Sequence, residues 1–228
     1  GVEALIRWQH PRHGCLSPAV FVPIFEANNR MNDLTDWIIN EVCIQLKDWQ
    51  QDELLPKQVA INIPGPYLTS DRLMDVLKST TEKYGIPPKA IELEITETSF
   101  VKTITGAEKA VNEFCKAGFS VALDDFGTGV SSLSYLKRIP VTTLKIDKSF
   151  IDDVPTSTKD ASIIKSVVQL GKSLNMEIVV EGVETVEQVQ FLIEHCHAPY
   201  IQGYYFAKPM KPDELLNWCR DYQTPVEA

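Results

Sequence analysis

The chain has 228 residues, enough for one large domain or two small ones, and its apolar (44%) and charged (23%) fractions are typical of a globular protein. The formal net charge of −9 argues against a general nucleic-acid-binding surface, although bound divalent cations could still admit a small anionic ligand. No run of about 18 apolar residues predicts a membrane span, and no signal peptide is visible.

Short apolar segments alternate with amphipathic stretches along the whole chain, which predicts an α/β domain with a parallel sheet or barrel. Seven strands are predicted, near 2–8, 58–63, 90–95, 119–124, 143–147, 177–181 and 199–205. Helices are predicted near 18–28, 33–50, 69–84, 106–117, 131–137, 159–175, 185–195 and 212–221. The Pro-rich points at 64–66 and 85–88 predict loops, and Gly171 is a candidate helix end.

The five cysteines are odd in number and scattered, and they contain no Cys-x-x-Cys pair. This pattern is typical of reduced thiols in a cytosolic domain rather than of a disulfide framework. We therefore expect the domain to be cytoplasmic, although its parent protein could be anchored to a membrane.

Each predicted strand carries a polar or charged side chain at or near its end. These residues are Glu3, Asn62, Glu94, Asp124 with Asp125, Lys145, Glu181 and Gln202. In a parallel barrel the carboxyl ends of the strands converge on one mouth, where the chemistry takes place. Carboxylate and amide oxygens are the ligands of hard divalent cations, so the sequence predicts a cation site at this mouth.

The adjacent pair Asp124 and Asp125 is the sharpest local signal. Neighbouring strand residues point to opposite faces, so both can reach one centre only if the backbone turns there, and Gly127 and Gly129 could supply that turn. One carboxylate could then bridge two cations, as in phosphate-cleaving enzymes. The alternative is a solvated Asp-Gly turn with no ligand role.

Several of the other residues also have ordinary structural explanations. Glu3 and Arg7 would share a strand face and could simply pair. Asn62 could satisfy loop backbone, and Glu184 could be a carboxylate at a helix start. Lys145 could lie at a strand rim, or it could be buried among carboxylates and orient or deprotonate a water.

Six motifs carry a family resemblance: EAL at 3–5 followed by Arg7-Trp8, ELEITE at 92–97, DDFGTGxSSLSYL at 124–136, LKID with SF at 144–150, EGVE at 181–184, and QGYxFxxP at 202–209. The sequence resembles the EAL domain family, bacterial phosphodiesterases that hydrolyse cyclic di-GMP, over roughly residues 2–215. The resemblance implies a modified TIM (β/α)8 barrel with a further strand upstream of Glu3. We therefore expect this chain to lack its first strand. We also expect residues 1–228 to form a single domain cut from a longer multidomain signalling protein.

The resemblance implies two Mg²⁺ or Mn²⁺ ions per active site. The ligands it implies for the first ion are Glu3, Asn62, Glu94 and Asp124. For the second ion it implies Asp124 and Asp125, with Glu181 contributing directly or through a bound water. The expected reaction is hydrolysis of cyclic di-GMP to linear 5′-pGpG by a water activated between the two metals.

Other matching positions receive roles from the resemblance. Lys145 orients or deprotonates the attacking water, and Glu97 holds the DDFGTG loop, which couples dimerisation to activity. Arg7 contacts phosphate, and Gln202 and Pro209 lie on the substrate side. Glu184 matches a supporting acid. Besides cyclic di-GMP the implied partners are a second copy of the domain and an upstream sensory or GGDEF domain; no DNA or RNA polymer is expected.

The sequence departs from the family pattern at a few points. Val130 replaces an aromatic residue and Pro64 replaces a serine. Residues 26–29 replace a usual glycine-containing turn, and asparagine, present at 28 and 29, tolerates the same left-handed backbone. Every implied ligand is retained, which favours catalysis. The alternatives are a degenerate domain that binds cyclic di-GMP without cutting it, and another metal-dependent barrel enzyme such as an enolising lyase.

Overall fold

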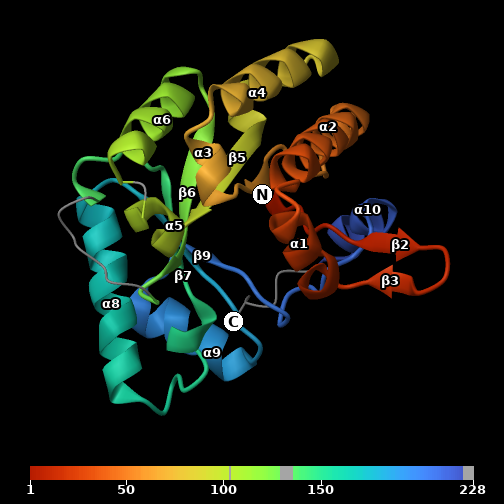
Figure 1. Cartoon of the computed structure of the whole chain (residues 1–228). Coiled ribbons are helices and arrows are strands. Elements are labelled where there is room, and N and C mark those ends of the chain that lie inside the picture. The colour runs from red at the N-terminus through yellow and green to blue at the C-terminus, as the bar shows by residue number, and fades with distance from the viewer. Residues whose placement is uncertain (103, 129–135, 223–228) are drawn as a thin grey trace.

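The computed structural model describes residues 1–102, 104–128 and 136–222 (Figure 1). A parallel sheet of seven strands forms its centre, with the order β1-β4-β5-β6-β7-β8-β9. These strands are β1 (Val2–Glu3), β4 (Val59–Asn62), β5 (Ile91–Thr96), β6 (Ser120–Phe126), β7 (Thr143–Ile146), β8 (Glu177–Val180) and β9 (Tyr200–Ile201). The spatial order follows the chain order, as expected for successive β-helix-β units.

The helices surround the sheet (Figure 1). They are α1 (Pro18–Ala27), α2 (Met31–Trp49), α3 (Gly65–Leu68), α4 (Asp71–Tyr84), α5 (Glu97–Lys102), α6 (Ile104–Lys116), α8 (Thr158–Ser173), α9 (Val186–Phe191) and α10 (Pro212–Asp221). Shorter turns are η1 (Pro88–Ala90), η2 (Lys148–Phe150) and the π-helical η3 (Leu192–Cys196). No helix in the described ranges is both long and apolar enough to cross a membrane.

The two faces of the sheet differ in polarity. Leu93, Leu144 and Ile178 are fully buried and belong to the core that the helices cover. The side chains next to them along the strands, such as Glu94 and Lys145, point to the opposite face because strand residues alternate, and these two touch each other there. The sheet therefore presents apolar residues outward and polar residues inward.

The two edge strands, β1 and β9, approach each other at their carboxyl ends. Gln202, directly after β9, donates a hydrogen bond of 3.1 Å from Nε2 to Oε2 of Glu3, the last residue of β1. The sheet is thus curled toward closure, and the predicted α/β barrel that is short of one strand is confirmed.

The predicted strand at 2–8 is wrong in its extent. β1 ends at Glu3, and β2 (Trp8–His10) pairs instead with β3 (Gly14–Leu16) in an antiparallel hairpin that projects from the sheet (Figure 1). Gly14 adopts a φ of 67°, a left-handed conformation that glycine tolerates, and this allows the chain to reverse. Arg7 therefore lies between strands and does not share a strand face with Glu3.

Other boundaries also differ from the prediction. The segment at 65–68 forms α3 instead of a loop, α5 begins immediately after β5, and β9 is shorter than predicted. Gly171 is not a helix end: it lies inside α8, where an added Cβ would overlap the side chain of Ile178, so glycine allows α8 to pack closely on β8. Of the two asparagines at 28 and 29, Asn29 has the left-handed backbone, with a φ of 54°. Val130, Gly129 and most of the helix predicted at 131–137 lie outside the described residues.

Candidate active site

Lys145 lies at the centre of a cluster of acidic side chains. Its Nζ is 2.5 Å from Oε1 of Glu94, 2.7 Å from Oε1 of Glu181 and 3.4 Å from Oδ1 of Asp124. These residues come from β5, β6, β7 and the position directly after β8, which are neighbours in the sheet. The side chain of Lys145 is only 4% exposed, so it is a buried, paired lysine and not one at a strand rim.

The cluster carries more negative charge than one lysine can neutralise. Burial raises the pKa of Glu94 to about 8 and that of Glu181 to about 7, although Lys145 opposes both shifts. The pKa of Asp125 is raised by burial and by neighbouring Asp124. Burial alone would lower the pKa of Lys145, but the surrounding carboxylates, Glu94 first, outweigh it and raise that pKa.

The donor set suits a hard divalent cation. Oε2 of Glu94 is buried without a hydrogen-bond partner, and Oδ1 of Asp124 has only its 3.4 Å ion pair with Lys145. Burying these oxygens is costly unless a further positive group completes the site. Asp124, Asp125 and Glu181 each place a carboxylate oxygen within 4.8 Å of the others. Oxygen ligands of this kind favour Mg²⁺ or Mn²⁺, so the residues present fit such ions.

A β-bulge brings Asp124 and Asp125 to one centre. β6 pairs with β7 through Leu123 and again through Phe126, but β6 uses one extra residue between these points. Asp125 itself has a φ of 53°, in the left-handed region, and Gly127 follows with a φ of 101°. The predicted turn is present, but it begins at Asp125 and not at the glycines.

Glu3 is held by two amides. Nδ2 of Asn62 donates to its Oε1 at 2.8 Å, and Nε2 of Gln202 donates to its Oε2 at 3.1 Å. Asn62 thus points to a carboxylate from the end of β4 and does not cap a loop. These contacts join both edges of the sheet at the mouth that carries the acidic cluster.

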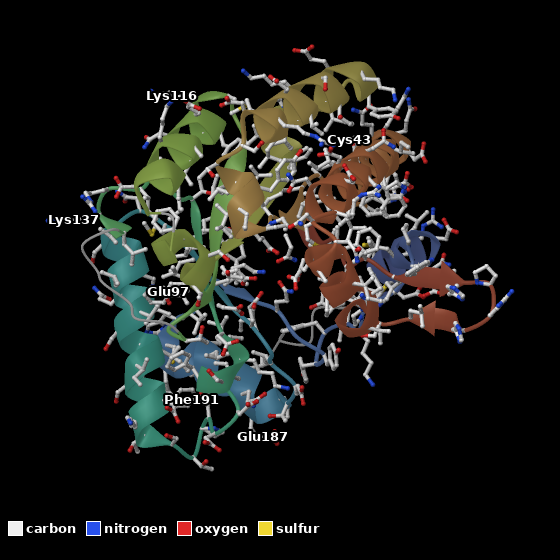
Figure 2. The ribbon with its side chains drawn as sticks, in the orientation of Figure 1. Cys43, Glu97, Lys116, Lys137, Glu187 and Phe191 are labelled. Carbon is white, nitrogen blue, oxygen red and sulfur yellow. The ribbon has the colours of Figure 1, made fainter. Side chains whose placement is uncertain are left out.

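Glu97 connects the start of α5 to the loop after β6. Glu97 is labelled in Figure 2. Its side chain is fully buried, and Oε2 accepts a hydrogen bond of 3.0 Å from the backbone N–H of Gly127. A carboxylate that accepts from a backbone amide is a strong, charge-assisted partner. The position of the Asp124–Asp125 pair is therefore coupled to α5.

Two predicted substrate residues are not joined to this cluster by any contact among the described residues. Nη1 of Arg7 donates to the carbonyl oxygen of Ile6 at 2.8 Å, whereas the carboxylate of Glu3 accepts from Asn62 and Gln202. Arg7 instead lines a cavity of about 320 Å³ beside α1 and α2. Pro209 is exposed in the irregular segment between β9 and α10.

Glu184 is more than a helix-start carboxylate. Its Oε1 accepts a hydrogen bond of 2.6 Å from Nζ of Lys148, which lies in η2. Sequence reasoning missed Lys148, and it also missed Asp147, whose charge helps to raise the pKa of Asp125. The sequence feature that could have pointed to these two residues is their position, as adjacent charged residues directly after β7.

Comparisons with known proteins give a consistent result. A family model described as EAL domain matches residues 1–209. The bifunctional diguanylate cyclase/cyclic di-GMP phosphodiesterase MucR of Pseudomonas aeruginosa is 35% identical over 217 residues, covering 95% of this chain and 31% of MucR. The cyclic di-GMP phosphodiesterase NbdA of the same organism is 36% identical over 222 residues, covering 97% of this chain and 28% of NbdA. The chain thus spans about three tenths of the length of these relatives.

Solved structures agree with the fold. The phosphodiesterase PaMucR in complex with c-di-GMP superposes with a TM-score of 0.86 and 33% identity, over 93% of this chain and 86% of that one. An EAL domain protein from Listeria monocytogenes EGD-e gives a TM-score of 0.81 and 32% identity, over 94% and 83% of the two chains.

Proposed function

This chain belongs to the EAL domain family, and we propose that it is a divalent-cation-dependent phosphodiesterase that hydrolyses cyclic di-GMP to linear 5′-pGpG. Its activity would lower the level of this bacterial second messenger. The observation that carries the proposal is the buried Lys145 in contact with Glu94, Asp124 and Glu181, a group with excess negative charge at the mouth of a curled sheet.

The proposal assigns two Mg²⁺ or Mn²⁺ ions to the cluster. The residues that would hold the first ion are Glu3, Asn62, Glu94 and Asp124. Asp124 and Asp125 would hold the second, together with Glu181. When bound, such ions polarise phosphodiester oxygens and lower the pKa of a water. The two buried oxygens without a hydrogen bond, Oε2 of Glu94 and Oδ1 of Asp124, support this assignment.

Lys145 would orient the attacking water. Without cations, the surrounding carboxylates raise the pKa of Lys145, so Nζ is a protonated hydrogen-bond donor in that state. Contacts with Glu94 and Glu181 fix the direction of this donor. Of the two roles that the sequence left open for Lys145, orientation of the water is therefore the better supported one.

The proposed reaction breaks one phosphodiester bond. Water attacks one phosphorus atom, the bond from that phosphorus to the ribose 3′ oxygen breaks, and the 3′ oxygen takes up a proton. Gln202 would contact the substrate, because its side chain lies at the mouth, where its amide donates a hydrogen bond to Glu3. Arg7 would contact phosphate and Pro209 would lie on the substrate side; these two roles rest on the family resemblance.

We also propose that residues 1–228 are one domain of a longer signalling protein with a sensory or GGDEF domain upstream. The support is that the relatives MucR and NbdA are about three times as long as this chain. A homodimer and a cytoplasmic location of the domain stay predictions.

Incubation of the purified domain with cyclic di-GMP tests the proposal. Chromatography should resolve pGpG when Mg²⁺ or Mn²⁺ is present and no product when EDTA is added. Tight binding without product would favour a receptor, and turnover of an unrelated substrate class would favour a different metal-dependent barrel enzyme.

A further inference from the structure

The turn η2 directly follows β7, the strand that carries Lys145. Asp147 caps it, because Oδ1 of Asp147 accepts from the backbone N–H of Ser149 at 3.0 Å. Backbone hydrogen bonds from Phe150 to Asp147 and from Ile151 to Lys148 then close the turn, at 3.2 and 2.7 Å. These hydrogen bonds fix the conformation of η2, which lies next to the acidic cluster.

Lys148 supports the loop that follows β8. Gly182, next to Glu181, has a φ of 73°, and an added Cβ would overlap Cβ and Cγ of Lys148. The hydrocarbon stem of Lys148 thus packs directly on the backbone beside Glu181, while Nζ donates to Glu184 at 2.6 Å.

A second connection fixes the far end of the same loop. The backbone N–H of Glu184 donates to Oε1 of Gln188 at 2.8 Å, and Nε2 of Gln188 donates to the carbonyl oxygen of Ile151 at 3.0 Å. Ile151 directly follows η2. The loop that carries Glu181 is therefore tied to η2 at both of its ends.

Phe150 supports the loop that follows β6. An added Cβ on Gly127 would lie 2.5 Å from Cε2 of Phe150, and Gly127 has a φ of 101°. The ring thus packs against the backbone two residues after Asp125. Because the Gly127 N–H also donates to Glu97, this loop is held between α5 and η2.

We infer that η2 sets the spacing between the two loops that carry the cation ligands, with Lys148 and Phe150 as positioning residues. The inference rests on the proposed function, because the carboxylates that it spaces are the proposed ligands. Asp124, Asp125 and Glu181 repel one another, so their close approach needs external support. η2 is a single element that touches both loops.

Mn²⁺ affinity in the absence of substrate tests this inference, measured by electron paramagnetic resonance on the full chain. Lys148→Ala removes the stem and the ammonium group, and we expect about tenfold weaker Mn²⁺ binding, as for other residues that orient metal ligands. The kcat for cyclic di-GMP should fall while KM changes little. Lys148→Arg, which keeps a stem and a charge, should restore both quantities.

Two further variants keep the test decisive. Lys148→Met retains most of the stem and can replace the alanine variant if that variant does not fold. Phe150→Leu tests the loop after β6 with the same readouts. Lys159→Ala, at an exposed lysine of α8, is the matched control. Thermal unfolding of each variant checks that the domain remains folded.

The outcomes separate the inference from the proposed function. Mn²⁺ affinity and kcat equal to wild type in Lys148→Ala, Lys148→Met and Phe150→Leu would overturn the role of η2 while leaving the phosphodiesterase intact. A wild-type domain that neither binds Mn²⁺ nor forms pGpG would overturn the proposed function itself.

Discussion

Lys145 illustrates at the residue scale how the site balances charge. A lysine 4% exposed is costly to bury alone, and so are the carboxylates around it. Each group therefore depends on the other, and removal of one partner of a buried ion pair typically destabilises a protein by about 3–5 kcal/mol. The same arrangement fixes an ammonium donor beside the proposed attacking water.

Replacing this lysine should affect catalysis more than binding. In Lys145→Met we expect kcat for cyclic di-GMP to fall by about 10²–10³-fold, because an oriented hydrogen-bond donor is lost. The Kd should change far less when measured with Ca²⁺, which we expect to support binding without turnover. Lys116→Met, at an exposed lysine of α6 (Figure 2), is the control. Equal losses in kcat and affinity would make Lys145 a substrate contact instead.

The raised pKa values of Glu94 and Glu181 predict a pH-dependent stability. Their folded pKa values of about 8 and about 7 lie above the ordinary 4.5, so the folded state binds these protons more tightly. This contribution is fully present below pH 4.5 and is lost as the pH rises through 7 and 8. Without cations, Tm should therefore fall between pH 6 and pH 9, by roughly 2–4 °C for each kcal/mol lost.

Saturating Mg²⁺ should remove this fall, because it compensates the ionised carboxylates. Glu94→Gln should flatten the Tm profile, whereas Glu113→Gln, at an exposed position of α6, should retain it. A cation-free Tm that is constant from pH 6 to pH 9 in the wild type would contradict the charge balance described for the cluster.

At the element scale, one feature of β6 could be predicted from the sequence and another could not. The adjacent Asp124 and Asp125 predicted that the backbone must turn. The bulge and the left-handed Asp125 were not predictable, because they depend on pairing with β7 across a long sequence separation. The hairpin of β2 and β3 was missed because its apolar and polar residues continue the pattern of β1, and only the short turn with Pro11 and Gly14 signals the reversal.

Glu97 links two elements, so its replacement tests coupling between them. Glu97→Ala leaves the Gly127 N–H without this carboxylate, and we expect kcat to fall by about 10–100-fold. Glu97→Gln keeps an oxygen acceptor but loses the charge, so its loss should be smaller. Thr98→Ala, exposed on the same helix, is the control. Wild-type kcat in Glu97→Ala would show that this contact does not position the acidic pair.

At the scale of the whole molecule, the sheet is held together at the mouth by side chains. β1 and β9 have no strand partner on their outer sides among the described residues. Glu3 bridges their ends through Gln202 and is also held by Asn62 at the end of β4. The alternation of strands and helices was sufficient to predict a parallel sheet or barrel, and the family resemblance favoured the barrel. The contacts of Glu3 were not predictable in detail, since they join residues that are 59 and 199 positions apart.

Cation binding should stabilise this edge. If Glu3 is a ligand, Mn²⁺ should slow amide hydrogen exchange in β1, because opening the edge would then require release of the ion. Exchange in the outer turns of α4 should stay unchanged. Equal exchange of β1 with and without Mn²⁺, at concentrations that saturate the domain, would remove Glu3 from the ligand set.

We propose the acidic cluster as a divalent-cation site for phosphodiester hydrolysis. The most direct test of this proposal is pGpG formation by wild type and Asp124→Asn at saturating Mn²⁺, with Asp75→Asn on α4 as the control. Asp124 is the proposed ligand of both ions, so we predict cation-dependent turnover in wild type and Asp75→Asn and none in Asp124→Asn, with all three folded. Undiminished turnover in Asp124→Asn, or wild-type turnover that persists in EDTA, would contradict the account.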